Sequence, residues 1–196
     1  MKKKIKYEFS QITTRGGDHG ESTLFNGERR RKDDPLFFLL GDLDELSSSM
    51  GVAIAGLKRF GPLSADDPRT VRWLEAMDDI QGKLIILGGM AANPDNRSRL
   101  KLNPLTEKDT EKLEFYQKEL MELTAISREL IHPGKTLFSA WIDVARTVCR
   151  RCERRVVKEI RVSVMTHLIP GQIYLNRLSD FLFISARYWE QISEEN

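Results

Sequence analysis

The sequence of 196 residues contains only two cysteines, three histidines and no long apolar run. Two cysteines are too few for the disulfide framework that stabilises small secreted domains. No stretch approaches the roughly 18 consecutive apolar residues that a membrane span requires. The basic start at residues 1–4 is followed by a mixed, charged stretch rather than by the apolar core of a signal peptide. We therefore expect a cytosolic protein with no membrane contact.

Charge of neither sign dominates the sequence. Lysine and arginine number 31 against 29 acidic residues, and the net charge of +2 gives no reason to expect nucleic acid as a partner. The basic residues are nevertheless concentrated in one place. Residues 146–161 contain seven basic and two acidic side chains, a local net charge of +5. This segment is a candidate site for a compact anion.

A composition of 40% hydrophobic and 31% charged residues is typical of a globular protein. The length predicts a single domain over residues 1–196. Residues 1–35 lack sustained periodicity and are rich in glycine, threonine and charge, whereas residues 36–192 follow a helical pattern. The irregular first part is a candidate nucleotide-binding segment, and the second part is the helical body.

Apolar residues recur at steps of three and four through the helical body, and Gly-Pro, Asn-Pro and Pro-Gly pairs interrupt the pattern. The helices predicted in this way run from beyond Pro35 to Gly61, over Pro68–Ala92, over Glu107–Ile131, over Thr136–Ile160, and onward from Pro170-Gly171. No segment alternates with a period of two for long enough to require a sheet. We therefore predict an all-α fold, a five-helix antiparallel bundle of the ferritin-like kind.

Residues 13–23 crowd three glycines, three threonines and a serine into eleven positions, together with Arg15. Glycine lets backbone N–H groups approach a phosphate closely, and hydroxyl and guanidinium groups add further donors. The stretch is not a Walker motif, because G-x-x-x-x-G-K-[ST] is absent. A polyphosphate cradle and a flexible surface turn both remain open at this point.

Asp143, Arg146, Arg150, Glu153 and Arg154 lie within one sector of the fourth predicted helix, because steps of three and four return to the same face. Such a row can bind phosphate through arginine forks, with the glutamate holding a guanidinium in position. The alternative is a solvated face of ion pairs between residues one turn apart.

Two further polar positions interrupt apolar stripes. Asp44 lies at the edge of the stripe of the first predicted helix, where a carboxylate needs a partner such as an arginine from a neighbouring helix or subunit. Asn176 and Asp180 share a face of the last helix with Phe183 and Arg187. That face is suited to holding a nucleoside, and equally to hydrogen bonding between helices.

The pair Cys149 and Cys152 has the C-x-x-C spacing of redox and metal sites. It lies inside a helical pattern with no βαβ unit around it, so we interpret both cysteines as small buried apolar side chains. A di-iron bundle is excluded because the three histidines form no Glu-x-x-His pair. The sequence predicts no protein-bound metal.

Taken together, these segments resemble the PduO-type ATP:cob(I)alamin adenosyltransferases, also called corrinoid adenosyltransferases. The resemblance extends from about residue 13 to about residue 188. The blocks that carry it are Thr14–Gly20 through Lys32–Pro35, then Gly41–Leu46, and then Cys149–Val156 with Tyr174–Asp180.

The resemblance implies a homotrimer of five-helix subunits with ATP and Mg²⁺ in a cleft between adjacent subunits. It implies catalytic roles for Asp44 and Arg150, which pair across the subunit boundary. The nucleotide ligands that it implies are Thr14, Arg15, Gly16, Gly17, Ser22, Thr23, Lys32, Arg150, Arg151, Glu153, Arg154 and Asn176.

The activity implied is transfer of the adenosyl group of ATP to a reduced corrinoid such as cobalamin, with release of triphosphate. A mutase or dehydratase that uses the product and a flavoprotein reductase are the implied partners. The chain departs from the family pattern at residues 130–135, which lack a Phe and a second Gly around the turn, and at Asp143, where His is common. An ATP-binding sensor without corrinoid turnover, or a helical bundle with no ligand, are the alternatives.

Overall fold

The structure is a computed structural model that describes residues 6–95 and 103–195. The basic start at residues 1–4 and most of the polar connection after residue 95 lie outside the described residues. The elements are α1 (Phe9–Ile12), β1 (Glu21–Thr23), β2 (Arg29–Arg31), α2 (Pro35–Phe60), α3 (Pro68–Ala91), α4 (Glu107–Glu122), α5 (Leu137–Val162), η1 (Thr166–Leu168) and α6 (Ile169–Glu195).

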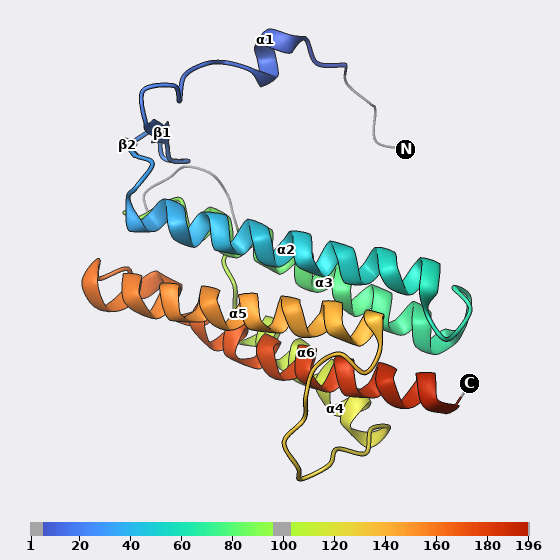
Figure 1. The fold of residues 1–196 in the computed structure, drawn as a ribbon. Coiled ribbons are helices and arrows are strands. Elements are labelled where there is room, and N and C mark those ends of the chain that lie inside the picture. Colours follow the sequence, from blue (N-terminus) through green and yellow to red (C-terminus); the bar gives the residue numbers. More distant parts are fainter. Residues whose placement is uncertain (1–5, 96–102, 196) are drawn as a thin grey trace.

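The mostly helical fold predicted from the sequence is confirmed, and the long helices lie side by side along one axis (Figure 1). Helix α2 packs on α3 and α5, and α6 packs on α4 and α5. Leucine, isoleucine, valine and aromatic side chains from all of these helices form one buried cluster. Within the described parts of the chain, no helix is long and apolar enough to cross a membrane.

Aspartate followed by proline begins two of the long helices. The Asp34 carboxylate accepts a hydrogen bond from the Leu36 N–H at 2.9 Å, and Asp67 accepts one from the Arg69 N–H at 2.8 Å. Such caps satisfy backbone donors that have no partner inside the helix, and the proline that follows has no N–H to satisfy. The start of α2 is thereby fixed directly after the N-terminal segment.

Helix α4 ends at Glu122, so the prediction of a helix to Ile131 is wrong. The side chain of Thr124 donates to the Leu120 carbonyl at 2.6 Å, and the N–H of Ala125 donates to Gln191 on α6 at 3.0 Å. The N–H of Ala125 thus forms a hydrogen bond to α6 instead of one within α4. Residues 123–136 form an open loop that leads to α5.

The all-α prediction is corrected by a two-stranded antiparallel hairpin in the N-terminal segment, in which Glu21 pairs with Arg31. Its turn contains Asn26 and Gly27, and the φ of Gly27 is +89°, a value that glycine adopts without strain. Figure 1 shows the hairpin beside the start of α2, with α1 standing apart from the helices. Leu24 is buried in the hydrophobic cluster, and it is the one buried side chain among residues 6–34.

Candidate functional site

The hairpin folds the glycine-rich stretch against Lys32. The Lys32 N–H donates to the Gly20 carbonyl at 2.8 Å, and Arg29 donates to the Gly16 carbonyl at 3.3 Å. A Cβ at Gly17 would lie 2.9 Å from the Lys32 ammonium nitrogen, so only glycine leaves that cation in place. The structure therefore places Gly16, Gly17 and Lys32 close together, and their role as nucleotide ligands stays a prediction.

The remaining predicted residues of this segment are Thr14, Arg15, Ser22 and Thr23. The Gly16 N–H donates to the Thr14 hydroxyl at 3.4 Å, and Arg15 has a φ of 58°. Ser22 and Thr23 lie on β1. Arg15 and Lys32 form no ion pair with any described residue, whereas Arg29, Arg30 and Arg31 each contact a carboxylate. The segment therefore holds two uncompensated cations beside glycine backbone.

On α5, Arg150 and Arg154 are exposed and form no ion pair within the described part of the chain. The neighbours four residues away on this face are Arg146 and Lys158, which are also basic, and Glu153 lies three residues after Arg150. Arg150 and Arg154 are themselves four residues apart, and like charges at this spacing disfavour a helix slightly, a cost that a bound anion would remove. The alternative of a solvated face of ion pairs therefore does not describe Arg150 and Arg154.

Arg151 and Arg155 face α2 instead. The Arg151 Nε lies 3.2 Å from an Asp42 oxygen, and its guanidinium also contacts Glu45. Arg155 pairs with Asp42 at 2.7 Å and stacks over the ring of Phe38, 5.0 Å from its centre. Arg151, one of the predicted nucleotide ligands, is thus engaged in ion pairs that join α5 to α2.

Asp44 is exposed, and it lines a hollow of about 180 Å³ between α2 and α3 together with Ile85. No hydrogen bond or ion pair joins its carboxylate to Arg150 or to another described residue. The structure of one chain therefore leaves the predicted pair of Asp44 and Arg150 separate, and each is open to a neighbouring molecule.

Glu153 and Asn176 are brought together. The Asn176 Nδ2 donates to a Glu153 oxygen at 3.1 Å, and the Asn176 Oδ1 accepts from Arg177 at 2.7 Å. Arg177 is held in turn by Glu114 of α4 at 2.8 Å. This chain of contacts fixes the orientation of the Asn176 amide. The sequence reasoning did not identify Glu114 or Arg177 as supports, although an arginine next to a predicted ligand was a visible signal.

Asp143 lies in a buried network rather than at the surface. It is 3% exposed, and its oxygens accept from Arg187 at 2.6 Å and from Arg146 at 2.8 Å. Arg187 also pairs with Glu190 at 2.8 Å, which accepts from the Ser139 hydroxyl at 2.9 Å. The cation that a buried carboxylate needs comes from α6. Arg187 is therefore structural in this chain, although the sequence placed it on the face of Asn176.

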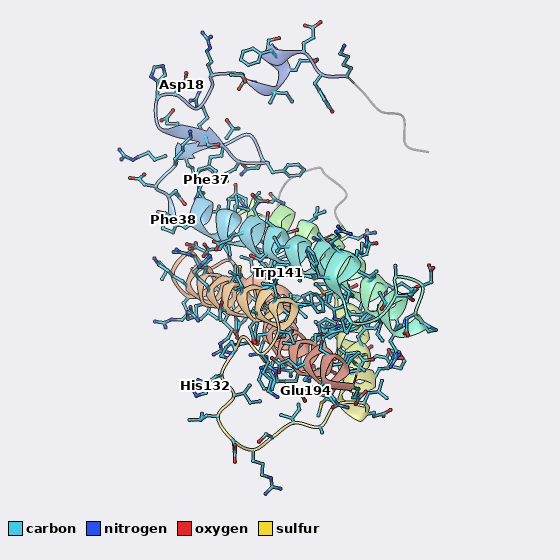
Figure 2. The ribbon with its side chains drawn as sticks, turned by 45° about the vertical axis from the view of Figure 1, so that its right-hand side comes forward. Asp18, Phe37, Phe38, His132, Trp141 and Glu194 are labelled. Atoms are coloured by element: carbon cyan, nitrogen blue, oxygen red, sulfur yellow. The ribbon has the colours of Figure 1, made fainter. Side chains whose placement is uncertain are left out.

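The loop at residues 123–136 and the hairpin lie on opposite sides of the molecule. Figure 2 shows Asp18 above α2, with His132 and Glu194 at the other end of the view. The loop and α6 line a hollow of about 560 Å³ to which both His132 and Glu194 contribute. Leu130 is 95% exposed on this loop. One chain therefore does not place the hairpin next to the loop.

Both cysteines are free and buried, as interpreted from the sequence. The Cys149 thiol donates to the Leu175 carbonyl at 3.3 Å. Burial raises the pKa of Cys152 to about 12, and it raises the pKa of Cys149 well above its ordinary value. A thiol that keeps its proton at neutral pH is a poor nucleophile and a poor metal ligand.

Known proteins of one family are similar to this chain. The family described as "Cobalamin adenosyltransferase" matches residues 12–189. A corrinoid adenosyltransferase of Citrobacter freundii is 35% identical over 181 residues, which cover 92% of this chain and 95% of that protein. A human corrinoid adenosyltransferase is 34% identical over 186 residues, covering 91% of this chain and 68% of that protein.

A solved structure is similar over nearly the whole chain. It is a variant PduO-type ATP:corrinoid adenosyltransferase from Lactobacillus reuteri complexed with cobalamin and ATP. The TM-score is 0.80 at 27% identity, with 93% of this chain and 95% of that chain covered. By sequence and by fold, the chain belongs to the cobalamin adenosyltransferase family.

Proposed function

We propose that this protein transfers the 5′-deoxyadenosyl group of ATP to the reduced cobalt of cob(I)alamin or a related corrinoid. The observation that carries the proposal is that four of the predicted ligands are cations that form no ion pair with a described residue, two beside the glycine loop and two on α5. They are Arg15, Lys32, Arg150 and Arg154. A polyphosphate supplies the charge that this set lacks.

The chemistry requires these residue types. Reduced cobalt is itself the nucleophile: the cobalt–carbon bond forms at C5′ while the C5′–oxygen bond breaks, and the electron pair leaves with triphosphate. The protein has to hold the two reactants in line and stabilise the leaving charge. Lys32 and the two arginines of α5 serve the leaving group, and the Glu153–Asn176 pair positions the nucleotide. Mg²⁺ ordinarily binds through substrate phosphates and retains several waters, so it would arrive with ATP.

We further propose that the long helices form an antiparallel five-helix bundle and that three copies assemble around shared sites. Asp44 of one subunit then pairs with Arg150 of the next, because each is exposed and neither has an ion-pair partner among the described residues of its own chain. The hairpin and the row on α5, which no described hydrogen bond or ion pair joins within one chain, would meet at that boundary.

The corrinoid requires an apolar wall that excludes its lower axial ligand. This chain has no Phe at the turn, and the apolar residues that the loop offers beside the hollow are Ile126, Leu130 and Ile131. We assign the corrinoid to this side, where the subunits would bring it to the ATP site. A flavoprotein reductase and a mutase or dehydratase that accepts the product are the proposed partners.

The visible spectrum of reduced cobalamin provides the test. Adding ATP and Mg²⁺ to the protein with cob(I)alamin should produce the spectrum of adenosylcobalamin, and the variants Arg150→Ala and Asp44→Ala should abolish the change. Lys118→Ala, which removes an exposed cation of α4, is the matched control and should retain activity. ATP binding without a spectral change would instead indicate a sensor, and absence of ATP binding would refute the proposal.

A further inference from the structure

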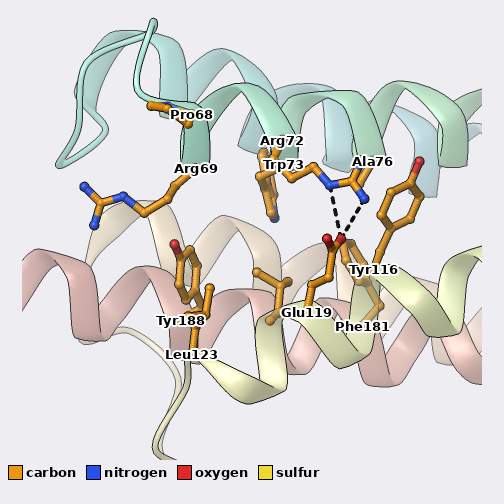
Figure 3. A pocket seen from close by; sticks show the side chains of 11 residues that line it. Pro68, Arg69, Arg72, Trp73, Ala76, Tyr116, Glu119, Leu123, Phe181 and Tyr188 are labelled. Atoms are coloured by element: carbon orange, nitrogen blue, oxygen red, sulfur yellow. Dashed lines mark hydrogen bonds and ion pairs between the residues drawn. The ribbon is translucent and has the colours of Figure 1, made fainter.

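A pocket of about 240 Å³ lies between α3, α4 and α6, and none of its lining residues belongs to α5 or to the N-terminal segment. Aromatic side chains form much of its wall. Trp73 reaches down from α3, Tyr116 stands on α4, and Phe181 and Tyr188 rise from α6 (Figure 3). Flat apolar walls of this kind favour a flat apolar ligand, because aromatic rings pack well in stacked or edge-to-face contacts.

The charged groups that line the rim of this pocket are each held in an ion pair, and Arg69 pairs with Asp67 at 2.9 Å. Arg72 of α3 contacts Glu119 of α4 at 2.7 Å, and Figure 3 shows this pair bridging the two helices. The Arg72 guanidinium also lies 4.8 Å from the centre of the Tyr116 ring. With the rim neutral, the pocket offers no net charge to an ionic ligand. A neutral molecule is therefore the better match.

One polar atom beside the pocket has no partner. Trp73 is 2% exposed, and its indole Nε1 is buried without a hydrogen-bond acceptor. A buried donor left unsatisfied costs free energy, and an acceptor that enters the pocket and reaches this N–H recovers it. The unsatisfied N–H selects for a ligand that carries an acceptor.

The volume limits the size of the ligand. An apolar cavity of about 150 Å³ is large enough to bind benzene. The present pocket, at about 240 Å³, has room for roughly two fused rings and lies below the range of about 300–1,000 Å³ that is usual for drug-sized ligands. We propose that this pocket is a second binding site, for a neutral molecule of two fused aromatic rings that carries one hydrogen-bond acceptor. The site is independent of the proposed adenosyl transfer.

Two probes of nearly equal shape test the proposal. Quinoline has a ring nitrogen that accepts a hydrogen bond, and naphthalene has none. Ligand-detected NMR titration of the full chain should show that both bind and that quinoline binds about three- to tenfold more tightly, as a net hydrogen bond predicts. In Trp73→Phe this preference should disappear. Trp189→Phe removes another buried, unpartnered indole that does not line the pocket, and there the preference should persist.

Two variants should close the pocket from different sides. Ala76→Leu fills it from α3, and Leu123→Trp covers it from the exposed end of α4, so that one of them remains informative if the other fails to fold. Both should abolish binding of quinoline, whereas Ala55→Leu on the exposed side of α2 should not. Absence of binding to the parent protein, or binding that survives both variants, overturns the site. An unchanged preference in Trp73→Phe overturns the role of the indole.

Discussion

The two faces of α5 differ in whether their charged side chains are paired. On the inward face, Asp143 is buried and paired with Arg187, and Cys149 and Cys152 are neutral thiols within the core. On the outward face, Arg150 and Arg154 stand one turn apart without an ion pair among the described residues. A buried charge needs a partner of opposite charge within the protein. An exposed charge is solvated by water and can remain unpaired until a ligand binds. The inward face is therefore expected to govern stability, and the outward face is expected to govern activity.

The strongest test of the inward face is Arg187→Met. It leaves the buried carboxylates of Asp143 and Glu190 without their shared cation, which should lower the free energy of unfolding by about 3–5 kcal/mol. Urea unfolding followed by circular dichroism measures this change. Arg154→Met is the control and should remain within about 0.5 kcal/mol of the parent. Equal losses in both variants would remove the distinction between the two faces.

The outward face is tested by Arg154→Ala. Loss of one cation at the leaving triphosphate should reduce the rate of adenosyl transfer roughly 100-fold or more, by analogy with other electrostatic contributions to catalysis. The helical content should stay at the parent value, because Arg154 contacts no described carboxylate. Turnover in the cobalamin assay that matches the Lys118→Ala control would show that this arginine does not serve the nucleotide.

The hairpin offers a smaller test of the same idea. In Gly17→Ala the new methyl group meets the end of the flexible Lys32 side chain, which can move away at little cost to stability. The displaced ammonium should weaken ATP binding about tenfold, as measured by calorimetry, and Lys32→Ala should give a similar loss. Gly82→Ala on α3, where a Cβ would meet nothing within 4 Å, should leave ATP binding unchanged. Unaltered affinity in Gly17→Ala would place Lys32 outside the site.

The smallest expected effect concerns the cysteines of the inward face. Because burial raises the pKa of Cys152 from 9.0 to about 12, the folded protein keeps a proton that the unfolded chain loses. This contribution to stability should be complete below about pH 9 and should be lost as the pH rises towards 12. At pH 8 neither cysteine should react with a thiol reagent until the protein is unfolded. Rapid modification of the native protein would contradict the burial of this face.

The sequence predicted the long helices best where local signals agree with packing. The predicted starts at Pro35 and Pro68 agree with α2 and α3, to which the structure adds the caps of Asp34 and Asp67, and the apolar stripes identify the buried faces. The end of α4 was missed because residues 123–131 have no local signal against a helix. At that end the Gln191 side chain of α6 accepts a hydrogen bond from the N–H of Ala125, which lies 66 residues earlier in the chain. The hairpin had a signal in Asn26-Gly27, but its strands of three residues are too short to show alternation.

The candidate site divides in the same way. Residue types and order marked Lys32, Glu153 and Asn176, and the structure shows Lys32 against Gly17 and Glu153 bonded to Asn176. Sequence alone did not indicate that Arg151 would be occupied by Asp42, because the register of α5 against α2 decides that contact. It also did not indicate that Asp143 would find Arg187 on α6. Such contacts depend on how two helices are aligned, which no single segment encodes.

The hairpin depends on very little of the core. Among residues 6–34 only Leu24 is buried in the hydrophobic cluster, so one leucine side chain anchors the segment that carries Gly17 and Lys32. A substitution at Leu24 would loosen this segment while the helices kept their packing. Under the proposed function, evolution could then tune the affinity for ATP through a change at this leucine while the packing of the helices stays the same.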